Sequence, residues 1–185
     1  MSKPEPDLPP GDYVFMAFLG CGPMSAYDVK KAMAGTVNFF WSAAHSQVYQ
    51  QARRLVRDGF IAERDDESSR RRRILSLTPK GEQALGAWLH TPAPLFRVYD
   101  EAIAKVFFGD QAGRESVLGV LEDQRRRHGE LLAAYEQMAL ALSNWDPGPA
   151  PPYQALTLKL GLSLERAWMA WLDETIAALR STGRK

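Results

Sequence analysis

The sequence predicts a mainly α-helical chain with one two-stranded β-hairpin, folded as two successive domains. Two observations support this prediction. Residues 11–91 contain short apolar segments with helix-cap signals and one strand-like hairpin, whereas residues 92–185 contain two long segments with helical apolar spacing. The proline-rich connector TPAPLF lies between them. We therefore predict a flexible arm over residues 1–10, a first domain over 11–91 and a second domain over 92–185.

The composition excludes several classes of protein. The 185 residues are 45% apolar and 24% charged, which is typical of a globular chain. Cys21 is the only cysteine, so we exclude a disulfide framework and a multi-cysteine zinc site and expect a reducing compartment. No apolar run reaches the roughly 18 to 20 residues of a membrane span, and the start MSKPEPDLPPGD is acidic and proline-rich, unlike a secretory signal. We expect a cytoplasmic protein without membrane attachment.

Three short helices are predicted first. DYVFMAFLG is an apolar segment that ends at Gly20. SAYDVKKAMAG begins with Ser25 as N-cap and has Asp28 three residues later, which is the spacing of a capping box. WSAAHSQVYQQARRLVRDG gives the third helix, with Ser42 as N-cap and Gly59 as the stop signal.

The third predicted helix has one apolar and one polar face. At 100° per residue, Val48, Ala52 and Leu55 fall on the apolar side. The opposite side and its flanks carry Ser46, Gln47, Gln50, Arg53, Arg54 and Arg57. These residue types donate hydrogen bonds to base edges and phosphates, and the face carries no acid before Asp58. A merely solvated helix usually includes glutamate, so the pattern favours contact with nucleic acid.

A hairpin and a fourth helix follow. FIAERDDE and RRRILSLT predict two strands around a turn at Ser68 and Ser69, with Leu75 and Leu77 anchoring the second strand. TPKGEQALGAWLH predicts a helix capped by Thr78. Four consecutive arginines, Arg70, Arg71, Arg72 and Arg73, occupy the distal part of the hairpin. Because side chains alternate along a strand, we expect either the first and third or the second and fourth of them to contact phosphate.

The order of three helices, a hairpin and a helix is that of a winged helix-turn-helix, whose third helix enters the major groove of DNA. The segment from Trp41 to Lys80 supports this reading with nine Lys/Arg against five Asp/Glu. The stretches GPMSAYDVKKAM, FFWSAAHSQVYQQARRLVRDGFI, RRRILSLTPKG and YDEAIAKVFFG resemble successive signatures of PadR-like transcriptional regulators. LTLKLGLSLERAWMAWLDETI is similar to the C-terminal helical domain of the longer, virulence-regulator branch. Together they cover most of residues 12 to 180.

The resemblance implies a homodimeric regulator of transcription that binds double-stranded DNA, most often as a repressor. It implies a recognition helix from Ala43 to Asp58. Residues nearest the bases would be Ser46, Gln47, Gln50 and Arg54, and residues placed for the phosphate backbone would be Tyr27, Lys30, Tyr49 and Arg53. The chain departs from the family pattern at Ala26, where glycine is usual, and in a wing tip that is not rich in glycine and proline.

The second predicted domain consists mainly of two long helices, about residues 114–144 and 153–180, separated by WDPGPAPP. Their apolar surface is too broad for a small wing domain to cover, so we expect burial against a second copy of the chain. The interface residues we predict are Leu121, Leu132, Tyr135, Leu156, Leu160, Leu164, Trp168 and Trp171. Paired domains would present two recognition helices to a pseudo-palindromic operator.

Two alternatives stay open at this point. Trp145, Trp168, Met169 and Trp171 could line a pocket at the dimer interface for a small apolar or aromatic effector, or they could be ordinary core residues. A winged helix can also serve as a protein-interaction adaptor, although the acid-free face of the third helix favours DNA.

We expect neither an enzyme nor a cofactor. The sequence has no glycine-rich phosphate loop, no HExxH and no GxSxG. His45, His90 and His128 are scattered, and Cys21 has no evident partner ligand, so we expect no metal site.

Overall fold

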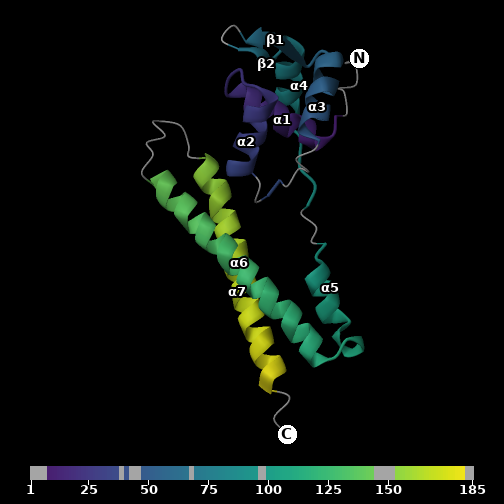
Figure 1. The fold of residues 1–185 in the computed structure, drawn as a ribbon, viewed down its shortest axis with the longest axis vertical. Helices are drawn as coiled ribbons and strands as arrows, with labels where there is room; N and C mark the ends of the chain where they lie inside the picture. The colour runs from purple at the N-terminus through teal and green to yellow at the C-terminus, as the bar shows by residue number, and fades with distance from the viewer. Residues whose placement is uncertain are drawn as a thin grey trace. The chain divides into compact units, whose positions relative to one another are not determined.

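The structure, a computed structural model, describes residues 8–37, 40–41, 47–66, 69–95, 99–143 and 153–181, with the backbone alone for residues 69–71. The chain divides into two compact units, Met1–Leu95 and Phe96–Lys185 (Figure 1). The sequence prediction put this boundary after Thr91. Each unit is described by itself below.

The first unit contains the predicted series of helices and strands. In order, the elements are α1 (Pro10–Gly20), α2 (Ala26–Gly35), α3 (Val48–Arg57), β1 (Ile61–Asp66), β2 (Ser69–Leu77) and α4 (Pro79–Leu89). The predicted start of the third helix, with Ser42 as cap and Ala43 as first residue, lies outside the described residues. The mainly helical fold with a two-stranded wing is confirmed.

Local capping explains where α2 and α4 begin. The Ser25 side chain accepts a hydrogen bond from the backbone N–H of Asp28 at 3.2 Å, and the Asp28 carboxylate accepts one from the Ser25 N–H at 3.1 Å. This is the predicted capping box. The Thr78 hydroxyl accepts a hydrogen bond from the Gly81 N–H at 3.2 Å, and Pro79 occupies the first turn of α4. Each cap satisfies an N–H group that the helix itself leaves unpaired.

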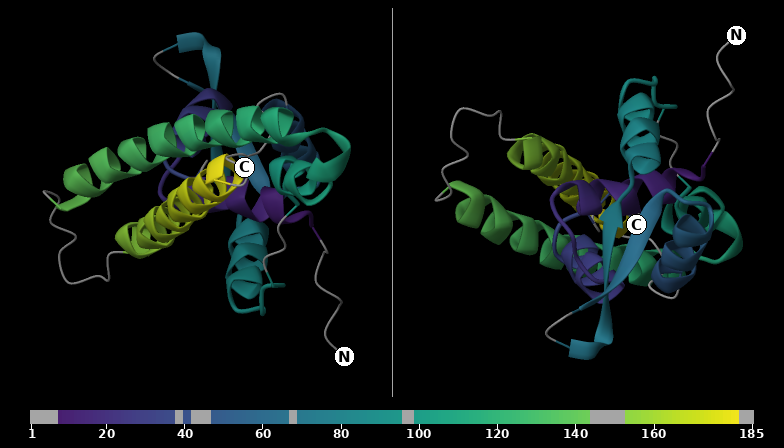
Figure 2. Two further views of the ribbon diagram at one scale, coloured as in Figure 1. Left: turned by 90° about the horizontal axis from the view of Figure 1, so that it is seen from below. Right: turned by 90° about the horizontal axis from the view of Figure 1, so that it is seen from above.

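One apolar core joins the elements of the first unit. Phe15, Met16, Val29, Leu55 and Ile61 are fully buried in it. The two strands pair antiparallel, from Ile61 opposite Leu77 to Asp65 opposite Arg73, and the register then shifts before Asp66. The hairpin extends beyond the helices of its unit (Figure 2).

The segment before α2 is tied to the second strand of the wing. Met24 and Leu75 exchange two backbone hydrogen bonds, Met24 N to Leu75 O at 3.1 Å and Leu75 N to Met24 O at 3.0 Å. Since backbone bonds of this kind fix both partners, the start of α2 keeps a defined place beside the wing.

The second unit is built around a long antiparallel helix pair. It contains α5 (Glu101–Phe107), a 3-10 turn η1 (Gly109–Gln111), α6 (Arg114–Ser143) and α7 (Tyr153–Ser181). Helices α6 and α7 lie side by side along their length (Figures 1 and 2). Leu121 and Leu172 are fully buried between them, and Val117, Leu118 and Ile176 complete this core. None of the described helices is long and apolar enough to cross a membrane.

The predicted interface residues fall into two groups. Leu121 and Tyr135 are buried within the unit itself, Trp168 and Trp171 pack against its core, and Leu132 is half-buried. In contrast, Leu156, Leu160 and Leu164 are 58%, 61% and 43% exposed. These three leucines, spaced four residues apart along α7, are called the leucine stripe below. The periodicity of the sequence marked both groups alike because packing inside a hairpin and packing between subunits need the same apolar spacing.

Candidate nucleic-acid interface

A groove of about 730 Å³ lies between the start of α2, helix α3 and the hairpin. Its charged lining consists of Arg53, Arg57, Arg72, Arg73, Asp28 and Glu63. Tyr27 and Tyr49 also line it, and they are 62% and 45% exposed. We call this the basic groove. It combines cations with aromatic side chains that carry hydroxyl groups, and both are partners for a phosphate backbone.

Packing of α3 decides which of its residues reach solvent. Val48, Ala52 and Leu55 are buried in the core of the first unit, as the apolar periodicity predicted. Gln47, Gln50 and Arg53 are consequently exposed on the other side. The predicted polar face therefore exists, apart from Ser46, which lies outside the described residues. Lys30 of α2 is half-buried.

Arg54, which was predicted to lie near the bases, forms an ion pair that the sequence did not predict. Its guanidinium makes two hydrogen bonds to the Asp12 carboxylate of α1, Nε to Oδ2 at 3.2 Å and Nη2 to Oδ1 at 2.5 Å. The Asp12 side chain is 0% exposed and that of Arg54 is 38% exposed. A buried carboxylate needs such a partner, so this pair joins α1 to α3 and engages the group that was expected near the bases. The predicted base contact of Arg54 stays a prediction, and it would require this guanidinium to leave or share Asp12.

The two described wing arginines are also paired with acids. Arg73 contacts Glu63 at 2.8 Å and Asp65 at 3.9 Å, both on β1. Arg72 contacts Asp28 at 2.5 Å and Asp66 at 3.7 Å. Both arginines line the basic groove although they are neighbours in β2, because each guanidinium follows its own acid partner. The expectation that one alternating pair of wing arginines contacts phosphate stays a prediction.

The side chains of the other two arginines of the wing, Arg70 and Arg71, lie outside the described part of the structure. The structure gives the backbone of Arg70 and Arg71 but not their side chains. Their assignment as phosphate contacts stays a prediction.

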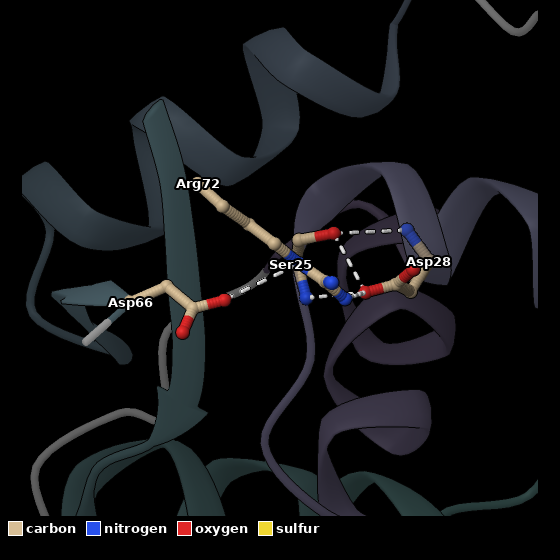
Figure 3. A network of polar contacts seen from close by, with 4 residues as sticks. All are labelled: Ser25, Asp28, Asp66 and Arg72. Carbon is tan, nitrogen blue, oxygen red and sulfur yellow. Dashed lines mark hydrogen bonds and ion pairs between the residues drawn. The ribbon is translucent and has the colours of Figure 1, made fainter. Parts of the chain in front are cut away.

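Asp28 is the centre of a small polar network between α2 and the wing (Figure 3). Its Oδ2 atom accepts hydrogen bonds from the Ser25 backbone N–H at 3.1 Å, the Ser25 hydroxyl at 2.7 Å and Arg72 Nη2 at 2.5 Å. The hydrogen bonds from Ser25 hold the pKa of Asp28 below its ordinary value, and the hydrogen bond and positive charge of Arg72 add to this effect, while desolvation acts in the opposite direction. The carboxylate is thus charged at neutral pH and faces the groove.

Arg57 at the end of α3 and Lys80 in the first turn of α4 both contact Asp58. Arg57 makes hydrogen bonds of 2.8 and 3.2 Å to the carboxylate of Asp58, which lowers the pKa of that acid. Lys80 donates to the backbone carbonyl of Asp58 at 2.6 Å and lies 4.1 Å from the ring centroid of Phe60. Among the described residues, Arg53 is the one groove arginine without a carboxylate partner.

The acids are what sequence reasoning missed in this region. Asp12, Asp28 and Glu63 come from three different elements, and each pairs with an arginine of α3 or β2. Asp28 was recognised only as a helix cap. No local pattern reveals the pairs because their members are separated by 10 to 44 residues.

A second polar cluster lies inside the α6–α7 pair. His128 Nδ1 is 2.5 Å from Glu165 Oε2, and the His128 ring stacks on Trp168 with centroids 4.7 Å apart. Trp168 in turn meets Trp171 edge to face at 5.4 Å. Trp168 and Trp171 therefore have packing partners within the unit, and Trp145 lies outside the described residues. The described residues contain no group of three or more His, Cys, Asp or Glu that could hold a metal.

Comparison with known proteins places this geometry in a family. The model of the "Transcriptional regulator PadR-like family" matches residues 15–87, and that of "Virulence activator alpha C-term" matches residues 98–180. The negative transcriptional regulator PadR of Bacillus subtilis is 27% identical over 175 residues, which are 90% of this chain and 96% of that protein.

Several solved structures have a similar fold over nearly the whole length of this chain. Bacillus subtilis PadR in complex with operator DNA has a TM-score of 0.82 at 26% identity, covering 92% of this chain and 98% of that one. The same protein with p-coumaric acid has a TM-score of 0.76 at 26% identity, covering 91% and 98%. The Vibrio cholerae virulence activator AphA has a TM-score of 0.75 at 26% identity, covering 92% and 98%. The chain therefore combines an N-terminal domain of the PadR-like family of transcriptional regulators with a C-terminal domain of the virulence-activator alpha type.

Proposed function

We propose that this protein is a sequence-specific DNA-binding repressor that occupies a pseudo-palindromic operator as a homodimer. The observation that carries the proposal is the basic groove beside the exposed face of α3. Gln47 and Gln50 present amide groups that can pair with base edges, and Arg53 and Tyr49 stand beside them for phosphates. The complex of Bacillus subtilis PadR with operator DNA and the role of that protein as a negative transcriptional regulator support the same proposal.

The leucine stripe supports the homodimer. A row of leucines at positions 156, 160 and 164 gives one apolar edge to α7, and exposed apolar rows of this kind are characteristic of surfaces that bind other proteins. A second copy of the chain is the partner that also doubles the DNA-binding surface. Two recognition helices about 34 Å apart would then read half-sites one helical turn apart. We propose that such a regulator acts in the cytoplasm, where it would have access to DNA.

The first experiment is footprinting of the purified protein on DNA upstream of its own gene, followed by mobility shifts over a range of salt. We expect protection of two half-sites, and an affinity that falls steeply with salt because phosphate contacts release counterions. A protein that protects no site and binds operator candidates no better than random duplex would contradict sequence-specific repression.

Gln50→Ala tests direct base readout. We expect loss of about 1 to 3 kcal/mol of operator binding, with little change on random duplex, because a glutamine amide discriminates bases but contributes little to phosphate affinity. Gln83→Ala is the matched control, since Gln83 is exposed on α4 and does not line the groove. Equal losses on operator and random DNA would show that Gln50 does not read sequence.

A small aromatic effector is the second candidate feature, favoured by the p-coumaric acid complex of Bacillus subtilis PadR. We propose that an aromatic acid of this kind lowers the affinity of the protein for its operator. Mobility shifts with and without p-coumaric acid test this proposal. The controls are buffer without any aromatic acid and buffer with an aliphatic acid. An unchanged operator affinity at millimolar p-coumaric acid would remove that compound from consideration.

A further inference from the structure

The charges of the basic groove are largely compensated from within the protein. Of its four arginines, Arg57, Arg72 and Arg73 each contact an acid of the chain. Two of these acids, Asp28 and Glu63, themselves line the groove. A DNA backbone that enters the groove therefore meets carboxylates as well as guanidinium groups.

The pair of Arg72 and Asp28 joins the wing to helix α2. Arg72 reaches from β2 to the start of α2, where the receiving oxygen of Asp28 is held by both the N–H and the hydroxyl of Ser25 (Figure 3). Asp66 lies on the other side of the guanidinium at 3.7 Å. Arg72 is thus fixed between two carboxylates, and a phosphate must displace at least one of them to bind it.

Asp28 opposes DNA binding in two ways, and both lower the affinity of the groove for DNA. It competes with phosphate for Arg72, and its own charge repels any phosphate that comes close to the groove. Its side chain is 34% exposed, so it faces solvent rather than the core. Its role as a helix cap does not require a charge, because an asparagine amide oxygen can accept the same bonds from Ser25.

We propose that Asp28 is an internal competitor for the DNA backbone, which keeps Arg72 in an ion pair and so limits the affinity of the groove for DNA of any sequence. This inference rests on the proposed function. In the wild type, transfer of Arg72 from Asp28 to a phosphate releases a counterion from DNA but leaves an unpaired carboxylate that attracts one. The contact therefore adds almost nothing to the salt dependence of binding.

Asp28→Asn separates the role of Asp28 as a helix cap from the effect of its charge. The substitution keeps the hydrogen-bond acceptor for Ser25 and removes the charge. We expect binding to a random duplex to tighten about 1.5- to 5-fold at moderate salt, the range that half-exposed ion pairs are worth. The slope of log K against log salt should also become steeper by about 0.9, because one further phosphate contact now releases its counterion without compensation.

Two controls make the test specific. Glu82→Gln removes the same charge from the exposed side of α4, away from the groove, and should leave affinity and slope close to those of the wild type. In the Arg72→Gln background, Asp28→Asn should lose most of its effect, because the arginine it would release is absent. Circular dichroism checks that each variant keeps the wild-type helix content.

The outcomes are distinct. Tighter binding with a steeper slope that depends on Arg72 supports the proposal. Unchanged or weaker binding by Asp28→Asn overturns it, as does an equal effect of Glu82→Gln, while operator footprints by the same proteins would leave the proposed function standing. A wild-type protein that binds no duplex even at low salt overturns both.

Discussion

Gly81 of α4 lies against the backbone of Phe60, the residue directly before β1, which makes Gly81→Ala a sharp test of the packing of the first unit. A Cβ atom at this position would stand 2.1 Å from the carbonyl oxygen of Phe60 and 3.1 Å from its carbonyl carbon. Carbon and oxygen atoms that are not bonded normally approach to about 3.3–3.6 Å. The added methyl group therefore overlaps backbone by more than an ångström, and no side-chain rotation can relieve it.

The size of the effect follows from what must move. The Phe60 carbonyl accepts hydrogen bonds from the Thr78 N–H at 3.1 Å and the Thr78 hydroxyl at 3.0 Å, and these bonds join β1 to the start of α4. Overpacking costs about 1–3 kcal/mol and each lost hydrogen bond about 1 kcal/mol. Alanine regains about 1 kcal/mol from its higher helix propensity. We expect the free energy of unfolding of the first unit to fall by about 2–4 kcal/mol.

The assay is urea unfolding of the full chain at one protein concentration, followed by near-ultraviolet circular dichroism. Tyr13 and Trp88 stack with ring centroids 5.0 Å apart in the first unit and contribute to that signal. Gly86→Ala in the same helix is the control, because a Cβ there meets nothing within 4 Å. It should stabilise the unit by about 0.5–1 kcal/mol. If Gly81→Ala unfolds at the same urea concentration as Gly86→Ala, the close packing of α4 on Phe60 is wrong.

Two further predictions concern the ion pair between α1 and α3 and the proposed contact between two copies of the chain. Asp12→Ala should lower the free energy of unfolding by about 1–3 kcal/mol. This is less than the loss expected for a fully buried pair, because Arg54 can turn toward solvent. In a urea double-mutant cycle, the double variant with Arg54→Met should recover part of the lost stability. Leu160→Glu should shift the protein toward monomer in sedimentation velocity with little change in helix content. Gln154→Glu makes the same charge change at an exposed position of α7 outside the leucine stripe and should leave the dimer intact. A dimer that survives Leu160→Glu would exclude the stripe as its interface.

The sequence alone determined the features that depend on neighbours along the chain. Cap residues such as Ser25 and Thr78 start helices through bonds to N–H groups three residues away, so a short pattern contains the whole signal. The apolar spacing of Val48 and Leu55 fixed which side of α3 is buried, and hence that Gln50 is exposed. These local signals gave the element order and the winged-helix fold.

Only the tertiary structure decided how each charge is used. Arg54 and Arg53 are adjacent and chemically identical, yet the first faces Asp12 of α1 and the second lines the groove. The same holds for the leucines of the second unit, since Leu121 is enclosed by α7 while Leu160 is exposed. A long charged or apolar side chain is compatible with either role, and the choice depends on which distant residue the fold brings within a few ångströms. That distance is a property of the packed chain, and no local pattern contains it.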